Sequence, residues 1–292
     1  MKKMEEQFKT IPVKEAESRL LVFLYKNLLG RFLLKGLIQA PVTKLTGWFL
    51  NSRGSKGLIQ PFIKKHQLDL KEYEPVTYGS FNHFFMREIK KAARPLSSNE
   101  TLLAAPCDGK VSAYAINEES IFHIKHSAYA LSELLDSNEL AEKWHGGTAV
   151  IFRLTPNDYH HYYFIDEGTI LEHREIAGVF HTVQPIAVHN EPVFSTNARE
   201  VTIIATKNFG QIAQIEVGAL MVGKIKNLKT NGTCSRFEKK GWFEFGGSTV
   251  ILLFQENQIA LNPVIEENTV RQLETLVTFG TILGKRVGKK GE

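Results

Sequence analysis

The chain has 292 residues, of which 43% are hydrophobic and 23% are charged, and its formal net charge is +5. This length and balance predict a globular protein with a full hydrophobic core and exclude an intrinsically disordered chain. Two cysteines, Cys107 and Cys234, are too few for a disulfide framework or a cysteine-based metal cluster, so we expect a reducing compartment and no metal.

The first part of the chain is basic and rich in leucine and phenylalanine. It has no acidic residue between Glu17 and Asp69, although lysine and arginine recur throughout this stretch. Drawn as a helix, its start has an apolar face and a basic face. The apolar face holds Leu21, Tyr25, Leu28, Leu29 and Phe32, and the basic face holds Arg31 and Lys35. Such a helix fits the surface of an anionic membrane, where each basic residue adds about 1 kcal/mol.

Two other interpretations of this stretch stay open, a helix packed on the core with solvated lysines and a nucleic-acid contact. The high leucine content and the expected lack of interleaved exposed aromatic residues argue against nucleic acid. No uncharged apolar run approaches the roughly 20 residues of a membrane span. Lys26, Arg31 and Lys35 interrupt the one candidate signal peptide. We therefore expect a peripheral membrane contact, with no span and no signal peptide.

In chain order, residues up to about Lys65 are predicted to be helical, with breaks at Pro41 and at residues 51–55. A second helix is predicted from Ser80 to about Lys91. After Pro106, short runs rich in Val, Ile, Phe and Thr alternate with turn residues and predict strands, for example at 148–154, 201–205, 212–217 and 248–254. The expected fold class is α+β, with a helical, membrane-surface region over 1–95 and a mostly β body over 96–292.

The most distinctive motif is Phe245-Gly246-Gly247-Ser248-Thr249, which stands directly before a predicted buried strand. Two glycines leave the peptide bond before Ser248 sterically open, so the serine hydroxyl could attack its own preceding carbonyl. An ordinary turn is the alternative for these five residues alone. A hydrolase nucleophile elbow fits poorly, because Val250 stands where that motif has glycine.

Two other segments could supply the groups that activate a serine. Asp108 precedes Gly109 in a predicted turn, and His160 and His161 follow the predicted strand 148–154. An acid, a histidine and a serine together form the kind of triad that activates a hydroxyl. Each segment alone is equally compatible with a structural turn or a buried, hydrogen-bonded histidine.

The order of motifs resembles the phosphatidylserine decarboxylase family from about Phe81 to Phe254. The matching segments are Phe81-Asn82-His83-Phe84-Phe85-Met86-Arg87, Ala93-Arg94-Pro95, Asp108-Gly109-Lys110-Val111, Asp158-Tyr159-His160, Asn197-Ala198-Arg199-Glu200, Val217-Gly218-Ala219 and Phe245-Gly246-Gly247-Ser248-Thr249. The resemblance implies a pyruvoyl-dependent enzyme that cuts itself between Gly247 and Ser248. Residues 1–247 would become the β chain and 248–292 the α chain of a heterodimer, whose further oligomerisation is left open.

In that scheme Ser248 attacks the Gly247 carbonyl and ends as the pyruvoyl group, which forms a Schiff base with the serine head group of the lipid. Asp108 is the carboxylate that we assign to orient the base. The family usually has His-x-x-His, and here His160 matches the first histidine whereas Tyr163 stands at the second position. We assign His160 as the base and His161 as the alternative.

The sequence therefore predicts a phosphatidylserine decarboxylase, peripheral on the cytoplasmic side of the cell membrane, with phosphatidylserine and an anionic membrane surface as partners and no nucleic acid. Three alternatives stay open. They are a pyruvoyl decarboxylase of a soluble amino acid, a serine hydrolase of lipids, and a processing-impaired, membrane-binding homologue, the last because of Tyr163.

Overall fold

The computed structural model describes residues 8–13, 19–124, 127–189, 191–220, 224–246 and 248–288. The strands are β1 (Lys9–Pro12), β2 (Leu102–Ala104), β3 (Gly109–Ala115), β4 (Ile121–Ile124), β5 (Ser127–Ala130), β6 (Thr148–Leu154), β7 (His161–Tyr163), β8 (Gly168–Ile176), β9 (Arg199–Thr206), β10 (Gln211–Val217), β11 (Ile225–Asn227), β12 (Gly232–Cys234), β13 (Lys239–Phe243), β14 (Ser248–Phe254), β15 (Ile259–Leu261), β16 (Leu273–Val277) and β17 (Ile282–Arg286). The α-helices are α2 (Arg19–Lys26), α3 (Leu28–Leu37), α4 (Ala40–Asn51), α5 (Ile59–His66), α6 (Phe81–Phe85), α7 (Leu131–Leu135), α8 (Asn138–Ala141), α9 (Pro185–Val188), α10 (Val193–Thr196) and α11 (Pro263–Val270). Short 3-10 helices cover Arg53–Leu58, Leu70–Glu72, Lys91–Ala93 and Glu142–Trp144.

A large antiparallel sheet forms the body. In the described part of the chain it has nine strands, in the order β1-β16-β3-β6-β14-β10-β9-β8-β12. Strand β14 lies at its centre, paired with β6 and β10, and all seven of its residues are buried. Its unbroken apolar run suits a strand that is covered on both faces. The α+β class and the predicted strands at 148–154, 201–205, 212–217 and 248–254 are confirmed.

A small sheet, β11-β13-β7, packs on one face of the large sheet. Lys240 on β13 forms a buried ion pair with Glu216 on β10, which places the two sheets against each other. Glu216 is the cross-strand partner of Val250 in β14. Because side chains alternate along a strand, Ser248 shares the face of Val250 and therefore points toward the small sheet.

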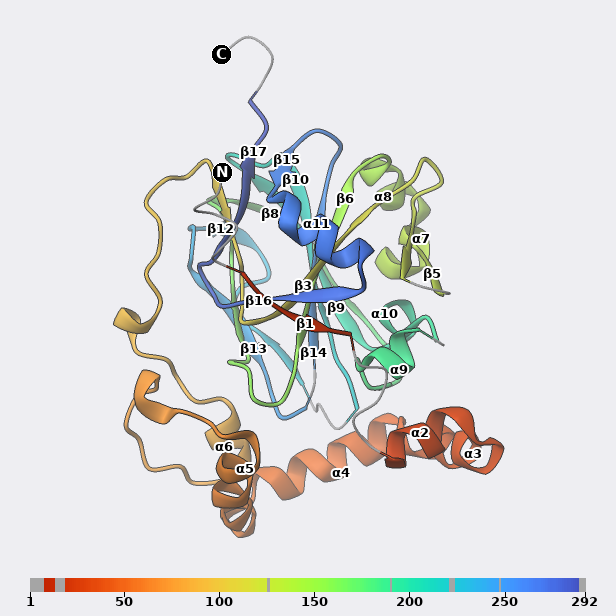
Figure 1. Cartoon of the computed structure of the whole chain (residues 1–292), viewed down its shortest axis with the longest axis vertical. Helices are drawn as coiled ribbons and strands as arrows, with labels where there is room; N and C mark the ends of the chain where they lie inside the picture. Colours follow the sequence, from red (N-terminus) through yellow and green to blue (C-terminus); the bar gives the residue numbers. More distant parts are fainter. Residues whose placement is uncertain are drawn as a thin grey trace.

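The N-terminal helices lie along one end of the body (Figure 1), with α2, α3 and α4 in a row and α5 and α6 beyond α4. The sequence analysis predicted one helix over residues 21–32, and this prediction was wrong. Asn27 caps a new helix by accepting hydrogen bonds from the Leu29 and Gly30 amides, so Tyr25 and Phe32 belong to different helices. Tyr25 is buried on the body, whereas Leu28 and Phe32 are exposed.

Three boundaries differ from the sequence-based expectation. Residues 9–12, expected to be helical, form the edge strand β1 against β16, where Pro12 needs no partner for its missing N–H. The break expected at Pro41 falls earlier, because this proline sits in the first turn of α4. The second helix ends at Phe85 instead of Lys91, since Arg87 is drawn into the body and Ile89 pairs with Tyr73. No helix in the described ranges is long and apolar enough to cross a membrane.

Candidate active site

Ser248 begins the central strand β14 and is fully buried. It pairs in register with Leu154 at the end of β6, so the segment that follows β6 passes close to it. Among the described residues its hydroxyl has no hydrogen-bond partner. A buried hydroxyl without a partner is costly, which is typical of a functional group. Gly247, the predicted residue on the other side of the cleaved bond, lies outside the described residues.

Helix α6 holds the chain just before this serine. The amide side chain of Asn82 accepts a hydrogen bond from the Phe245 backbone N–H at 3.0 Å. The Phe245 ring meets the rings of Phe81 and Phe85 edge-on, each at 5.0 Å between centroids. The short helix itself is capped by Ser80, which accepts from the His83 amide. Sequence reasoning assigned Asn82 no role, and the only signal was a polar residue within an aromatic motif.

His160 carries one unprotonated ring nitrogen. Its Nδ1 lies 2.9 Å from the carbonyl oxygen of Asp158, which can only accept, so Nδ1 carries the proton. The buried Nε2 then carries a lone pair, and it has no hydrogen-bond partner in the described structure. The ring packs on Phe85 at 4.2 Å, and Phe85 in turn contacts Phe245. Burial lowers the pKa of His160 to about 3, so it is neutral and able to accept a proton at pH 7.

The loop that carries His160 is clamped from two sides. Arg87 donates from Nη2 to the carbonyls of Asn157 and Asp158, at 3.2 and 3.3 Å. Lys110 donates to the Asp158 carboxylate at 2.7 Å and to the Thr155 hydroxyl at 2.6 Å. Although burial alone would raise it, these contacts hold the pKa of Asp158 below its ordinary value. The arrangement fixes the His160 ring, and the positioning roles of Arg87 and Lys110 were not predicted.

His161 occupies a different environment. Its Nε2 lies 3.1 Å from the carbonyl of Met86, and its ring stacks on Tyr159 at 4.6 Å. The other nitrogen, Nδ1, faces Glu88 at 3.9 Å. Burial lowers the pKa of His161 to about 4. Its free nitrogen is therefore directed to Glu88, whereas the ring of His160 contacts Phe85 beside the Gly-Gly-Ser junction.

The structure does not connect Asp108 to either histidine by a hydrogen bond. Its carboxylate is paired with Arg94 at 2.9 Å and accepts from the Phe279 amide at 2.7 Å. Burial raises the pKa of Asp108, and Arg94 limits the rise. Tyr163 stacks on the Phe279 ring at 3.8 Å, and its hydroxyl lies 3.0 Å from that of Tyr159. The orienting role assigned to Asp108 stays a prediction.

A pocket of about 510 Å³ opens beside the junction. Phe245 and Gly246 line it together with the last residues of β6. Lys110 and Arg153 line it, each ion-paired with a carboxylate, and apolar surface comes from residues such as Leu21 on α2. The pocket therefore joins the body to the N-terminal helices and combines polar N–H groups with apolar walls, as an amphiphilic ligand requires.

Comparison with known proteins agrees with this geometry. A sequence model of the family described as "Phosphatidylserine decarboxylase" matches residues 81–281. The chain is 41% identical over 273 residues to phosphatidylserine decarboxylase proenzyme 2 of Clostridium acetobutylicum, covering 93% of this chain and 94% of that one. It is 39% identical over 272 residues to a phosphatidylserine decarboxylase proenzyme of Fusobacterium nucleatum, covering 90% of each. A proenzyme of the same name from Ruminiclostridium cellulolyticum is 39% identical over 281 residues, 94% of each chain.

The fold, the buried serine and histidine and these relatives define the chain as an enzyme of the carboxy-lyase class. It belongs to the phosphatidylserine decarboxylase family.

Proposed function

We propose that this chain is a proenzyme that cuts itself between Gly247 and Ser248 and then converts phosphatidylserine to phosphatidylethanolamine and CO₂. The observation that carries the proposal is a pair of buried atoms without partners, Ser248 Oγ and His160 Nε2. One is a nucleophile and the other a base in the required protonation state. Ser248 stands in the segment that the family resemblance marks as the processing site, and His160 is linked to that segment through Phe85, whose ring contacts both the His160 ring and Phe245.

In the first step Ser248 Oγ attacks the Gly247 carbonyl carbon. His160 Nε2 takes the hydroxyl proton and returns it to the Ser248 nitrogen as the peptide bond breaks, which leaves an ester. Elimination of the ester releases the Gly247 carboxylate, and hydrolytic loss of ammonia converts Ser248 into the pyruvoyl group. The clamps on the His160 loop and the Asn82 contact to Phe245 hold the two reacting segments in register.

The pyruvoyl group would supply an electron sink for decarboxylation. Ser248 is a fitting origin for it, because the residue is fully buried and its oxygen is committed to no other group among the described residues. This chain's own contribution to that step is the pocket beside the junction. Lys110 and Arg153 line it and, although ion-paired with Asp158 and Glu274, offer N–H donors to the phosphate and carboxylate of the head group.

The two product chains would stay together as a heterodimer. Strand β14 would open the α chain, yet it is paired along its length with β6 and β10 of the β chain. Removing it would expose seven buried residues at the centre of the sheet. We therefore expect both fragments to purify as one folded unit.

The basic N-terminal helices are proposed to rest on an anionic membrane, on its cytoplasmic side. Leu28 is 85% exposed and Phe32 and Trp48 are each 73% exposed, which is unusual for side chains of this size. Arg31 and Lys35 lie on the same helix as Phe32, so apolar insertion and charge attraction act together. The division into a membrane region over 1–95 and a catalytic body over 96–292 is part of this proposal.

A vesicle assay tests the substrate and the membrane contact together. Purified protein is given phosphatidylserine in anionic vesicles or free L-serine, and CO₂ release is measured. Release from the lipid alone supports the proposal, whereas release from serine alone would make the enzyme a decarboxylase of a soluble amino acid. Phe32→Ser combined with Trp48→Ser should reduce co-sedimentation with vesicles; unchanged binding would contradict the membrane contact.

A further inference from the structure

A row of three glutamates crosses the large sheet from β10 to β8. Glu175 on β8, Glu200 on β9 and Glu216 on β10 are directly opposite one another in the strand register. They therefore point to the same face of the sheet. Carboxylates placed opposite each other on neighbouring strands repel, which destabilises the sheet unless cations intervene.

One of the three glutamates forms an ion pair with a lysine of this chain. Lys240 lies 2.6 Å from Glu216, and both side chains are fully buried. Glu175 and Glu200 form no ion pair with a lysine or arginine in the described part of the chain. In the described part of the chain Glu200 therefore has His173 as its ion-pair partner and Glu175 has none. Both glutamates line a cavity of about 490 Å³ together with Lys224 and Lys226, which gives this end of the row access to solvent.

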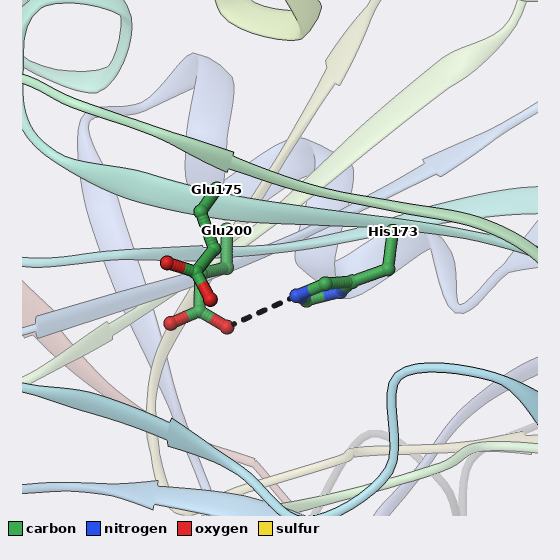
Figure 2. A group of neighbouring side chains, drawn as sticks. All are labelled: His173, Glu175 and Glu200. Atoms are coloured by element: carbon green, nitrogen blue, oxygen red, sulfur yellow. Dashed lines mark ion pairs between the residues drawn. The ribbon is translucent and has the colours of Figure 1, made fainter.

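His173 completes the group, as Figure 2 shows, because its ring reaches toward the Glu200 carboxylate beside Glu175. Its buried Nε2 lies 3.3 Å from Glu200 Oε2, the ion pair drawn as a dashed line in Figure 2. Two ligands of one tetrahedral zinc ion would be about 3.3 Å apart, given metal–ligand distances near 2.0–2.1 Å.

Neighbouring groups already orient these side chains. His173 Nδ1 lies 3.0 Å from the Thr202 hydroxyl, and the Asn227 amide donates to Glu200 Oε2 at 2.6 Å. Metal-binding histidines and carboxylates are typically held by such outer partners. A ligand atom from each of His173, Glu175 and Glu200 lies within 4.8 Å of the others, so small movements bring all three onto one ion.

We propose that His173, Glu175 and Glu200 bind one divalent transition-metal ion of the zinc type. One nitrogen and two carboxylate oxygens suit such an ion, and solvent from the adjoining cavity would complete the coordination. The ion would clamp β8 to β9 and cancel the repulsion within the glutamate row. It would stabilise the fold from a site separate from Ser248.

Calorimetric titration of the full chain, freed of metal by a chelator, tests the site with Zn²⁺ alone as the probe. We expect saturable binding of one Zn²⁺ at this site, with Mg²⁺ far weaker because it prefers six oxygen ligands. His173→Gln should weaken Zn²⁺ binding at least about tenfold. Glu172→Gln, on the same strand but on its opposite face, is the matched control and should bind like the parent.

If His173→Gln fails to fold, Glu175→Gln replaces it, since Glu175 is exposed and its loss leaves the core intact. The visible absorption of bound Co²⁺ gives a second readout, which should disappear in the site variant and persist in Glu172→Gln. Absence of saturable Zn²⁺ binding by the parent, or equal binding by the site variants, would overturn the proposal.

Discussion

In the proposed reaction the proton of Ser248 goes to His160, although the family pattern would place a second histidine where this chain has Tyr163. A tyrosine is a weak base, and burial raises the pKa of Tyr163 further from neutrality. His160→Gln should therefore leave the precursor uncut, whereas Tyr163→Phe and His161→Gln should still be processed. Denaturing electrophoresis after expression separates one band from two.

The controls decide which residue is the base. Cleavage of His160→Gln at the parental rate, together with an uncut His161→Gln, would transfer the role to His161. An uncut Tyr163→Phe would show that the hydroxyl pair with Tyr159 takes part in processing.

His160 should also make stability depend on pH. Its pKa is about 3 in the folded chain but about 6.5 when unfolded, so only the unfolded chain takes up this proton between about pH 6.5 and 3. The stabilisation is complete above the unfolded pKa and is lost as pH falls, by about 1.4 kcal/mol per pH unit. Urea unfolding of Ser248→Ala, with and without His160→Gln, isolates this contribution. A constant difference between the two over this range would contradict the buried neutral histidine.

At the residue scale, the sequence predicted Ser248 and His160 but not what holds them. Asn82 and Arg87 bind residues 70 or more positions away in the chain. Lys110 binds Asp158 in the loop that follows the neighbouring strand β6. No local sequence pattern indicates such contacts. The sequence analysis did not predict the glutamate row with His173 for the same reason. Strand pairing, not proximity in the sequence, brings Glu175 and Glu200 together.

At the scale of single elements, α6 is expected to control processing through one hydrogen bond. Asn82→Ala would leave the Phe245 N–H without its acceptor, which costs about 1–3 kcal/mol if it stays buried. Self-cleavage should slow by about tenfold or more, because the chain before Ser248 loses its register. Time-resolved electrophoresis of the precursor measures the rate. Asn51→Ala is the control and should be cut normally, because it removes the outer partner of Asn82 and a bond to the Gly47 carbonyl but keeps the acceptor of the Phe245 N–H. Equal rates for both variants would exclude this role of α6.

The hairpin of α2 and α3 depends on a close approach at Gly30. A Cβ there would lie 2.0 Å from the Phe23 carbonyl oxygen, so Gly30→Ala forces the two helices apart. We expect weaker co-sedimentation with anionic vesicles, since Leu28 and Phe32 would lose their common orientation. Gly36→Ala on the same helix meets nothing within 4 Å and should bind vesicles at least as well as the parent. Identical losses in both variants would refute the explanation.

Local sequence patterns predicted helices and strands correctly where a single feature, such as an apolar run or a capping residue, determines the element. The apolar run of β14 and the Ser80 cap of α6 were both located from sequence. The patterns failed where a distant contact decides the structure. Arg87 ends α6 by binding the 157–158 loop, and residues 9–12 become a strand because β16 offers an edge.

At the scale of the whole molecule, composition predicted the α+β class and the order of helices before strands. The topology could not be predicted, since β14 pairs with β6, about a hundred residues earlier, while the small sheet covers the face that holds Ser248. This arrangement explains how a chain could be cut next to the central strand of its sheet and still remain folded. The cleaved bond would lie at the start of the central strand, and pairing on both sides would hold the new terminus in place.

The most direct test of this account is the intact mass of the purified protein under denaturing conditions, beside Ser248→Ala. We predict two fragments, residues 1–247 and 248–292, with the smaller one carrying a pyruvoyl group at its N-terminus, and a single uncut chain for the variant. A single uncut mass for the folded parent protein would contradict self-processing and, with it, the proposed use of Ser248.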